Sequence, residues 1–154
     1  MKGFIESEII KAVKRLLHGR VNEILGNWEI VVPIIEFGEI SGMYAVSPVI
    51  TLSSCERTEK ERIIRLDAYC LNIAFTLQEH HDGELFCYGY SNAFNKAILE
   101  DFTLGGIADG AVITSKKYIP PKKPRCGEGW GLVLTLRVTV ENPLPCRLTQ
   151  GINT

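Results

Sequence analysis

The fold is decided by residues 130–141, which read WGLVLTLRVTVE. Large aliphatic residues alternate here with smaller or polar ones, as they do in a strand that buries one of its faces. The side chains on the buried face are Leu132, Leu134, Leu136, Val138 and Val140. This stretch therefore predicts a long strand with its aliphatic side against a core.

A second long strand is predicted over residues 62–77, where large and small residues again take opposite sides. The large set is Tyr69, Leu71, Ile73, Phe75 and Leu77. A helix stays open for this segment, because Leu66, Tyr69, Ile73 and Leu77 also fit helical spacing. The clustered β-branched and aromatic residues favour the strand.

Two amphipathic helices are predicted, over residues 3–25 and 84–100, from apolar residues at intervals of three and four. Gly26 and Asn27 stand where a left-handed cap would end the first helix. Asp82 is placed to cap the second, and Gly89 inside it predicts a close packing contact.

Shorter elements complete the order. Strands are expected over residues 30–37, 44–52 and 111–118, and a charged hairpin tip over 53–61. Runs of strands with two helices predict an α+β domain over residues 1–141, with two layers and helices packed on one face of the sheet. The sheet should be mainly antiparallel, with mixed pairing left open. Residues 142–154 are expected to form a C-terminal tail, a candidate for mobility.

Composition excludes several functions. The chain has 154 residues and a net charge of −1, which argues against a dedicated nucleic-acid binder. Its five cysteines show no CxxC pair, so neither a disulfide framework nor structural zinc is expected. Charges throughout the first fifteen residues argue against a signal peptide or membrane span, so we expect a cytosolic protein.

No catalytic, cofactor-binding or metal-binding residue stands out. His80, His81 and Asp82 are interpreted as an exposed turn, with the two histidines expected to point apart, and His18 as part of a solvated helix face. Residues 104–110 are glycine-rich but lack the Gly-Lys-Ser/Thr ending of a phosphate loop, so a turn is expected. A basic loop is the strongest binding candidate, for an acidic partner or DNA, although such loops are often merely soluble. Its residues are Lys116, Lys117, Lys122, Lys123 and Arg125.

The second half of the chain resembles a known family. The pattern consists of YGYSNA at 88–93, AILED at 97–101, TLGGIAD at 103–109, Lys117-Tyr118 and the strand 131–141. It is similar to phage tail proteins of the terminator and tail-completion type, including the minor tail protein U group. The resemblance extends over roughly residues 48–141.

The resemblance implies a structural virion or prophage protein, not an enzyme. It implies a homo-oligomeric ring, commonly a hexamer, that caps the tail tube and joins it to head–tail connector proteins, with assembly in the host bacterial cytoplasm. DNA would pass such a ring without specific binding. A ring needs two different surface patches in contact, and the first helix, the strand edges and the charged hairpin are candidates. The candidate interface residues are Arg57, Glu59, Arg65, Asp67, Arg137 and Glu141.

Two other classes stay open. One is a non-catalytic adaptor or binding module built on the same scaffold, since a fold alone does not fix function. The other is a small cysteine or metal hydrolase around Cys70 or His80.

Overall fold

The computed structural model describes residues 3–28, 32–38, 45–59, 65–122 and 127–141. In chain order, its helices and strands are α1 (Ile5–Leu16), the π-helical turn η1 (Leu17–Val21), α2 (Asn22–Asn27), β1 (Val49–Glu59), β2 (Arg65–Gln78), α3 (Gly83–Glu100), β3 (Gly110–Ile119) and β4 (Glu128–Glu141).

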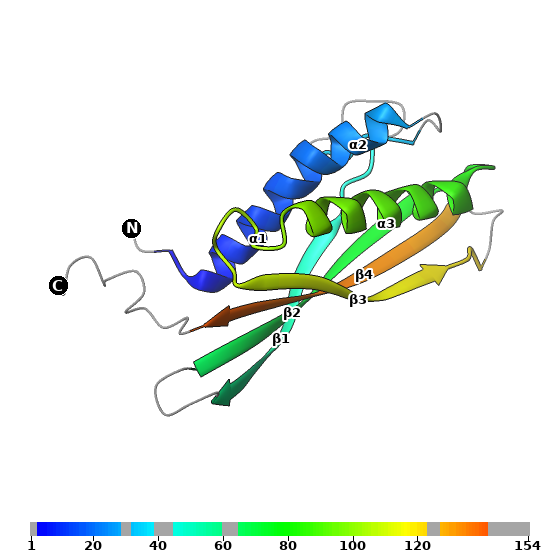
Figure 1. The fold of residues 1–154 in the computed structure, drawn as a ribbon. Coiled ribbons are helices and arrows are strands. Elements are labelled where there is room, and N and C mark those ends of the chain that lie inside the picture. The colour runs from blue at the N-terminus through cyan, green and yellow to red at the C-terminus, as the bar shows by residue number, and fades with distance from the viewer. Residues whose placement is uncertain (1–2, 29–31, 39–44, 60–64, 123–126, 142–154) are drawn as a thin grey trace.

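The strands form one sheet in the order β1-β2-β4-β3, and each neighbouring pair is antiparallel. The helices lie together on one side of this sheet (Figure 1). The predicted α+β class, with helices on one face, is therefore confirmed, and the pairing of the four strands is antiparallel throughout.

The core lies between the sheet and the helical layer. Both long strands alternate as predicted, because the aliphatic and aromatic residues of β2 and β4 that face the helices are buried and their neighbours on the other face, apart from Ala68, are not. Tyr90 from α3 stacks on Phe75 from β2, with ring centroids 5.1 Å apart and planes 9° from parallel. Residues 65–77 lie within the strand β2, so the predicted strand is confirmed there and the helix that stayed open is wrong.

The first helix runs from Ile5 to Asn27 without a break, since the residues at both internal boundaries keep right-handed helical dihedrals. Arg20, within η1, fixes it to the end of α3 through two hydrogen bonds to Glu100, of 2.7 and 2.9 Å. The predicted left-handed cap is wrong. Gly26 and Asn27 belong to the helix, which ends at Trp28 in an extended conformation.

The strand expected over 30–37 is wrong for residues 32–37, the part that the structure describes. Only one isolated bridge forms, between Ile35 and Val46. The reason is that side chains of the helices take the backbone hydrogen bonds of Pro33 and Ile35. The Asn22 amide accepts from Ile35 N–H at 2.7 Å and donates to Ile35 C=O at 2.8 Å, and the Tyr90 hydroxyl donates to Pro33 C=O at 3.0 Å.

Two more predictions change at β1. The strand expected over 44–52 begins at Val49, and the expected hairpin tip at 53–61 is strand as far as Glu59. The polar composition of residues 53–59 was interpreted as a turn, but β1 is an edge strand whose outward side chains face water. Residues 60–64, between β1 and β2, lie outside the described residues.

The helix α3 and the strand β3 agree closely with the sequence analysis. Asp82 occupies the N-cap position of α3, although its side chain makes no capping hydrogen bond there. A Cβ added to Gly89 would lie 2.9 Å from Val32 Cγ1, which confirms the predicted close contact. The predicted turn after α3 is also present. Asp101 accepts a hydrogen bond from Gly105 N–H at 3.0 Å, and Leu104 takes a positive φ of 52°.

Candidate subunit interface

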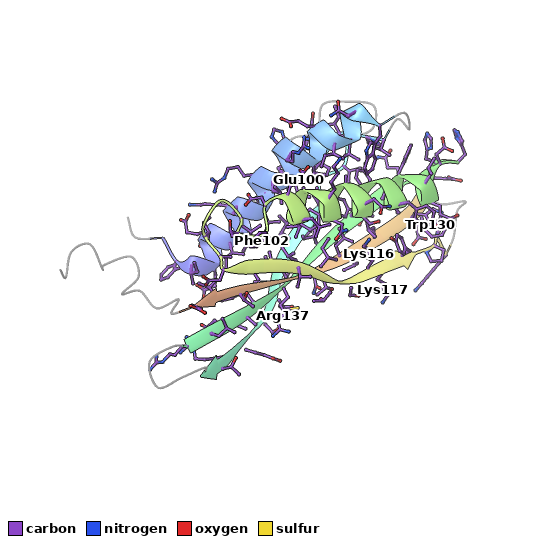
Figure 2. The ribbon with its side chains drawn as sticks, in the orientation of Figure 1. Glu100, Phe102, Lys116, Lys117, Trp130 and Arg137 are labelled. Carbon is purple, nitrogen blue, oxygen red and sulfur yellow. The ribbon has the colours of Figure 1, made fainter. Side chains whose placement is uncertain are left out.

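The face of the sheet away from the helices is left uncovered by the described residues (Figure 1). It presents small and polar side chains in rows across the strands. One row runs Thr51, Asn72, Thr135 and Ser115, and within it Thr135 donates a hydrogen bond of 3.1 Å to Asn72. Arg137, a predicted interface residue, is exposed on this face beside Val112 of β3 (Figure 2). We name this surface the open sheet face.

The sheet also has two outer edges, formed by β1 and β3. Within the described residues, no strand pairs with the outer side of either. Because the sheet has four strands and every pair is antiparallel, β1 and β3 run in opposite directions. A second copy in the same orientation could therefore add its β3 to β1 and continue the antiparallel alternation.

Charge differs between the two edges. Lys117 lies opposite Val133, which places it on the open sheet face, while Lys116 lies opposite Leu134 on the helical side (Figure 2). Glu56 of β1 lies opposite Ala68, on the open sheet face. One edge thus offers an ammonium group and the other a carboxylate on the same face of the sheet.

Arg57 and Asp67 form an ion pair between β1 and β2. The guanidinium donates two hydrogen bonds to the carboxylate, of 2.7 and 2.8 Å, and the Asp67 side chain is only 2% exposed. The Arg57 hydrogen bonds hold the pKa of Asp67 below its usual value. Because its charge is buried and paired within one chain, Asp67 lies inside the domain and not on the exposed intersubunit surface expected for it.

The other predicted interface residues lie near the same end of the sheet. Arg65 is exposed opposite Glu59 in the ladder between β2 and β1. Glu141 ends β4 and donates its backbone N–H to the Asp109 carboxylate at 2.6 Å. Arg65 and Glu141 thus lie at the same end of the sheet, where β2 begins and β4 ends.

The predicted basic loop divides into two parts. Lys116 and Lys117 belong to β3 and are held in the ladder with β4, so they are strand residues and not loop residues. Lys122 is exposed just beyond the strand. Lys123 and Arg125 lie outside the described residues. The ordered basic charge is therefore a feature of a sheet edge.

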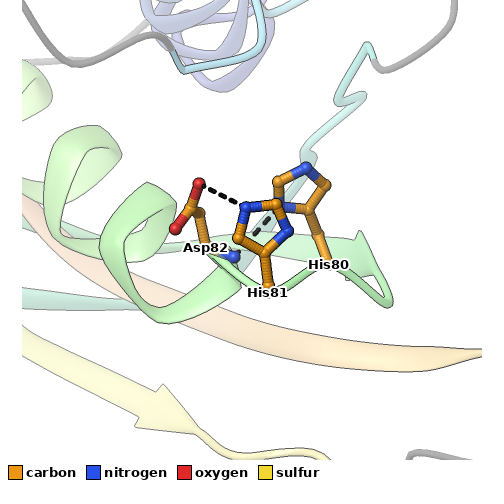
Figure 3. Close-up of side chains that lie close together, drawn as sticks. All are labelled: His80, His81 and Asp82. Carbon is orange, nitrogen blue, oxygen red and sulfur yellow. Dashed lines mark hydrogen bonds and ion pairs between the residues drawn. The ribbon is translucent and has the colours of Figure 1, made fainter.

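The turn before α3 brings His80, His81 and Asp82 together, as Figure 3 shows. The expectation that the histidines point apart is wrong, because their rings stack with centroids 4.4 Å apart. His81 Nε2 lies 3.1 Å from the Asp82 carboxylate, and donor atoms of all three residues lie within 4.8 Å of one another. His80 Nδ1, however, accepts a hydrogen bond of 3.0 Å from Asp82 N–H. The lone pair of neutral His80 is then in use, so metal binding would require this turn to rearrange.

The three described cysteines, Cys55, Cys70 and Cys87, are free. Cys87 is fully buried on α3, and this burial raises the pKa of its thiol to about 11. Burial and the nearby Asp67 charge raise the pKa of Cys55. Cys70 lies half-buried on the open sheet face. A catalytic thiol needs a lowered pKa, so the described shifts are opposite to those of a nucleophile.

Sequence analysis missed one surface, the outer side of α3. Leu85, Tyr88, Leu99 and Phe102 are large apolar residues that remain exposed. Beside the first two lies a groove of about 270 Å³, lined also by Trp28, Val32, Gly89 and Asn92. The signal in the sequence was the presence of apolar residues in and just after α3 that fall outside its buried stripe.

The comparisons with known proteins add no relative. No protein-family model matches the chain, and no curated protein is significantly similar to it. Of the helices in the described residues, none combines the length and the apolar character needed to span a membrane.

Proposed function

We propose that this protein is a phage-type tail terminator or tail-completion subunit, which assembles as a ring, commonly a hexamer in the resembling family, on the end of a tail tube. Its partners are further copies of itself, the tail tube protein and head–tail connector proteins, and its final location is the virion tail. The proposal draws on the sequence resemblance over residues 48–141 and on an α+β fold whose surfaces suit assembly.

The observation that carries the proposal is the two outer edges of the sheet, which run in opposite directions and have no partner strand among the described residues. A ring requires one patch of each copy to meet a different patch on the next copy. The outer side of β3 on one subunit and the outer side of β1 on the next meet this requirement, since they are different surfaces that pair without reversing the subunit. Backbone hydrogen bonds across that seam would supply affinity.

Charge gives the seam its selectivity. Lysine on an edge strand ordinarily discourages unspecific pairing, and each edge also carries a bulge, at Ser53 in β1 and at Thr114 in β3. A neighbouring subunit that places its Glu56 beside Lys117 offsets the positive charge that otherwise discourages pairing at this edge. The edges are thus guarded against arbitrary strands. Lys117 lies in the row of Val49 and Glu56 in the row of Gly110, so the two charges meet only when the two strands pair with a stagger along their length.

The test is a charge swap read by light scattering over a wide concentration range at two salt levels, together with capture by purified tail tube protein. Lys117→Glu or Glu56→Lys alone should weaken assembly by about fivefold per contact, and the double variant should restore it. Lys122→Glu, an exposed lysine beyond the strand, is the matched control and should leave assembly unchanged. Wild-type protein that neither self-assembles nor binds tube tips would overturn the proposal in favour of an unrelated adaptor.

A further inference from the structure

The turn before α3 is closed by a hydrogen bond that a histidine ring accepts. His80 Nδ1 accepts the backbone N–H of Asp82 at 3.0 Å, and His80 C=O accepts the N–H of Gly83 at 3.1 Å. Asp82 C=O in turn accepts the N–H of Phe86 at 2.9 Å, which is the first helical hydrogen bond of α3. The His80 ring is therefore part of the structure that starts this helix (Figure 3).

This acceptor exists only while His80 is neutral. A neutral imidazole has one nitrogen that accepts and one that donates, and the Asp82 N–H gives the accepting role to Nδ1. In the protonated ring both nitrogens donate, so Nδ1–H would face the Asp82 N–H and the hydrogen bond would be lost. Histidine is the side chain that ordinarily changes its charge between about pH 5 and 8. The start of α3 thus includes a hydrogen bond that acid removes.

Two features of the surroundings separate His80 from His81, although their rings stack with centroids 4.4 Å apart. His81 Nε2 lies 3.1 Å from the Asp82 carboxylate, which compensates a charge on that ring where it stands. The His80 ring instead lies 4.9 Å from the ring of Phe86, beside the N-terminus of α3. The first N–H groups of a helix carry partial positive charge and offer no partner to a cation. Of the two histidines, His80 is therefore the one whose protonation changes the turn.

An acidic pocket of about 270 Å³ lies beside the same turn. Both histidines line it together with Glu79 and Glu128, and its remaining walls are Pro121, Gly129 and Trp130. The carboxylates come from the residue that follows β2 and from the first residue of β4. Two other charged residues are near in sequence: Glu84 of α3 accepts a tyrosine O–H, and Lys122, after Pro121, does not line the pocket. Apart from histidine, the described charged side chains that line the pocket are thus carboxylates.

We propose that His80 is a pH-sensitive switch at the start of α3. The neutral ring holds the Asp82 N–H. When a proton from solvent binds Nδ1, the ring releases that N–H and turns toward the carboxylates of Glu79 and Glu128. Gly83 limits the extent of the change, because a Cβ added there would lie 3.0 Å from Trp130 Cδ1, so the helix start is packed against β4. The rearrangement is confined to residues 80–82.

The switch goes beyond the proposed ring and does not depend on it. The turn joins the end of β2 to α3, whereas the proposed seam uses the outer sides of β1 and β3. What the switch changes is a surface, since the pocket beside Trp130 is open near neutral pH and is occupied by the charged His80 ring in acid. The change is local to one chain, so failure of this test and failure of the ring test are distinguishable.

The first measurement follows the Asp82 backbone amide of the full chain by ¹H–¹⁵N NMR at pH 7.5 and pH 5.0. Its exchange with water, corrected for the intrinsic effect of pH, should become about twofold to tenfold faster in acid, when the hydrogen bond is lost. His80→Phe keeps a flat ring beside Phe86 but removes the acceptor, so the amide should exchange at the faster corrected rate at both pH values. His81→Phe is the matched control, which keeps the ring stack and the His80 acceptor and should show the wild-type response.

The second measurement reads the pocket in the same spectra. The indole N–H signal of Trp130 should move over the pH range in which the Asp82 amide responds, and it should not follow that response in His80→Phe. The signal of Trp28, which lines a different groove, is the internal control. Circular dichroism at 222 nm checks that both variants are folded. An Asp82 amide with the same corrected exchange at both pH values, or with an equal response in wild type and His80→Phe, overturns the proposal.

Discussion

Gly89 offers a test of how α3 packs against the segment after α2. A Cβ at this position would lie 2.9 Å from Val32 Cγ1, closer than real Cβ contacts come. Alanine should gain about 1 kcal/mol over glycine in a helix interior. Overpacking a filled site costs about 1–3 kcal/mol. The overpacking cost exceeds the gain in helix propensity, so Gly89→Ala should destabilise the protein by about 0–2 kcal/mol.

Val32→Ala removes the methyl groups that obstruct an added Cβ at position 89. It should therefore reverse the sign of the effect that Gly89→Ala has on stability. On its own this change should cost about 1.5–3 kcal/mol, because Val32 is buried. In the Val32→Ala background, Gly89→Ala should stabilise the protein by about 1 kcal/mol, since only the higher helix propensity of alanine over glycine remains. The coupling between the two sites is then about 1–3 kcal/mol.

The assay is guanidinium denaturation of all four proteins of this cycle, followed by circular dichroism at 222 nm. Gly26→Ala is the control, since Gly26 is also helical but has nothing within 4 Å of an added Cβ. It should stabilise by up to about 1 kcal/mol. If Gly89→Ala stabilises equally in both backgrounds, the packing of Val32 on Gly89 is refuted.

Two further predictions concern ionisable groups. Asp67→Asn should lower stability at pH 7, because Arg57 holds the pKa of Asp67 in the folded protein below 3.8. The loss of stability relative to wild type should become smaller as the pH falls below 3.8 and the wild-type carboxylate protonates. Denaturant midpoints at pH 7 and pH 3 measure this loss, and an equal loss at both pH values would contradict the ion pair. Cys87, buried and with a pKa of about 11, should be alkylated by iodoacetamide far more slowly than exposed Cys55 at pH 7.5, as peptide mass spectrometry can measure; fast labelling of Cys87 would revive the hydrolase alternative.

Much of the fold was predictable because the strongest signals are local. The alternation along β4 and β2 and the helical spacing in α1 and α3 place the buried sides correctly, since each element buries one face. The errors fall where distant groups decide the structure. Residues 32–37 have strand-like composition, but the Asn22 side chain takes the backbone hydrogen bonds of Ile35. No local pattern announces a contact between a helix and a segment 13 residues away.

The candidate interfaces were predictable only in part, because charge in a sequence does not tell which side chains are already paired. Asp67 has the same local pattern as Arg137, since each is a charged residue in an alternating strand. The antiparallel register places Asp67 next to Arg57 and buries it, while Arg137 faces the open side. Register depends on the whole sheet, so these two roles separate only once the strands are paired.

The exposed apolar residues of α3 show that a sequence pattern also does not tell which apolar side chains are covered. Periodicity assigns apolar residues to a core face, and the six residues Phe86, Tyr90, Ala93, Phe94, Ala97 and Ile98 are enough to explain a buried helix. Leu85, Tyr88 and Leu99 then look like imperfections in the pattern. Once the sheet fixes which side of the helix is covered, the same three residues lie outside the buried side, and Phe102 is exposed just beyond the end of α3. Buried and exposed apolar residues on one helix are distinguishable only by what covers each. The core of a single chain therefore does not account for the exposure of Leu85, Tyr88 and Leu99.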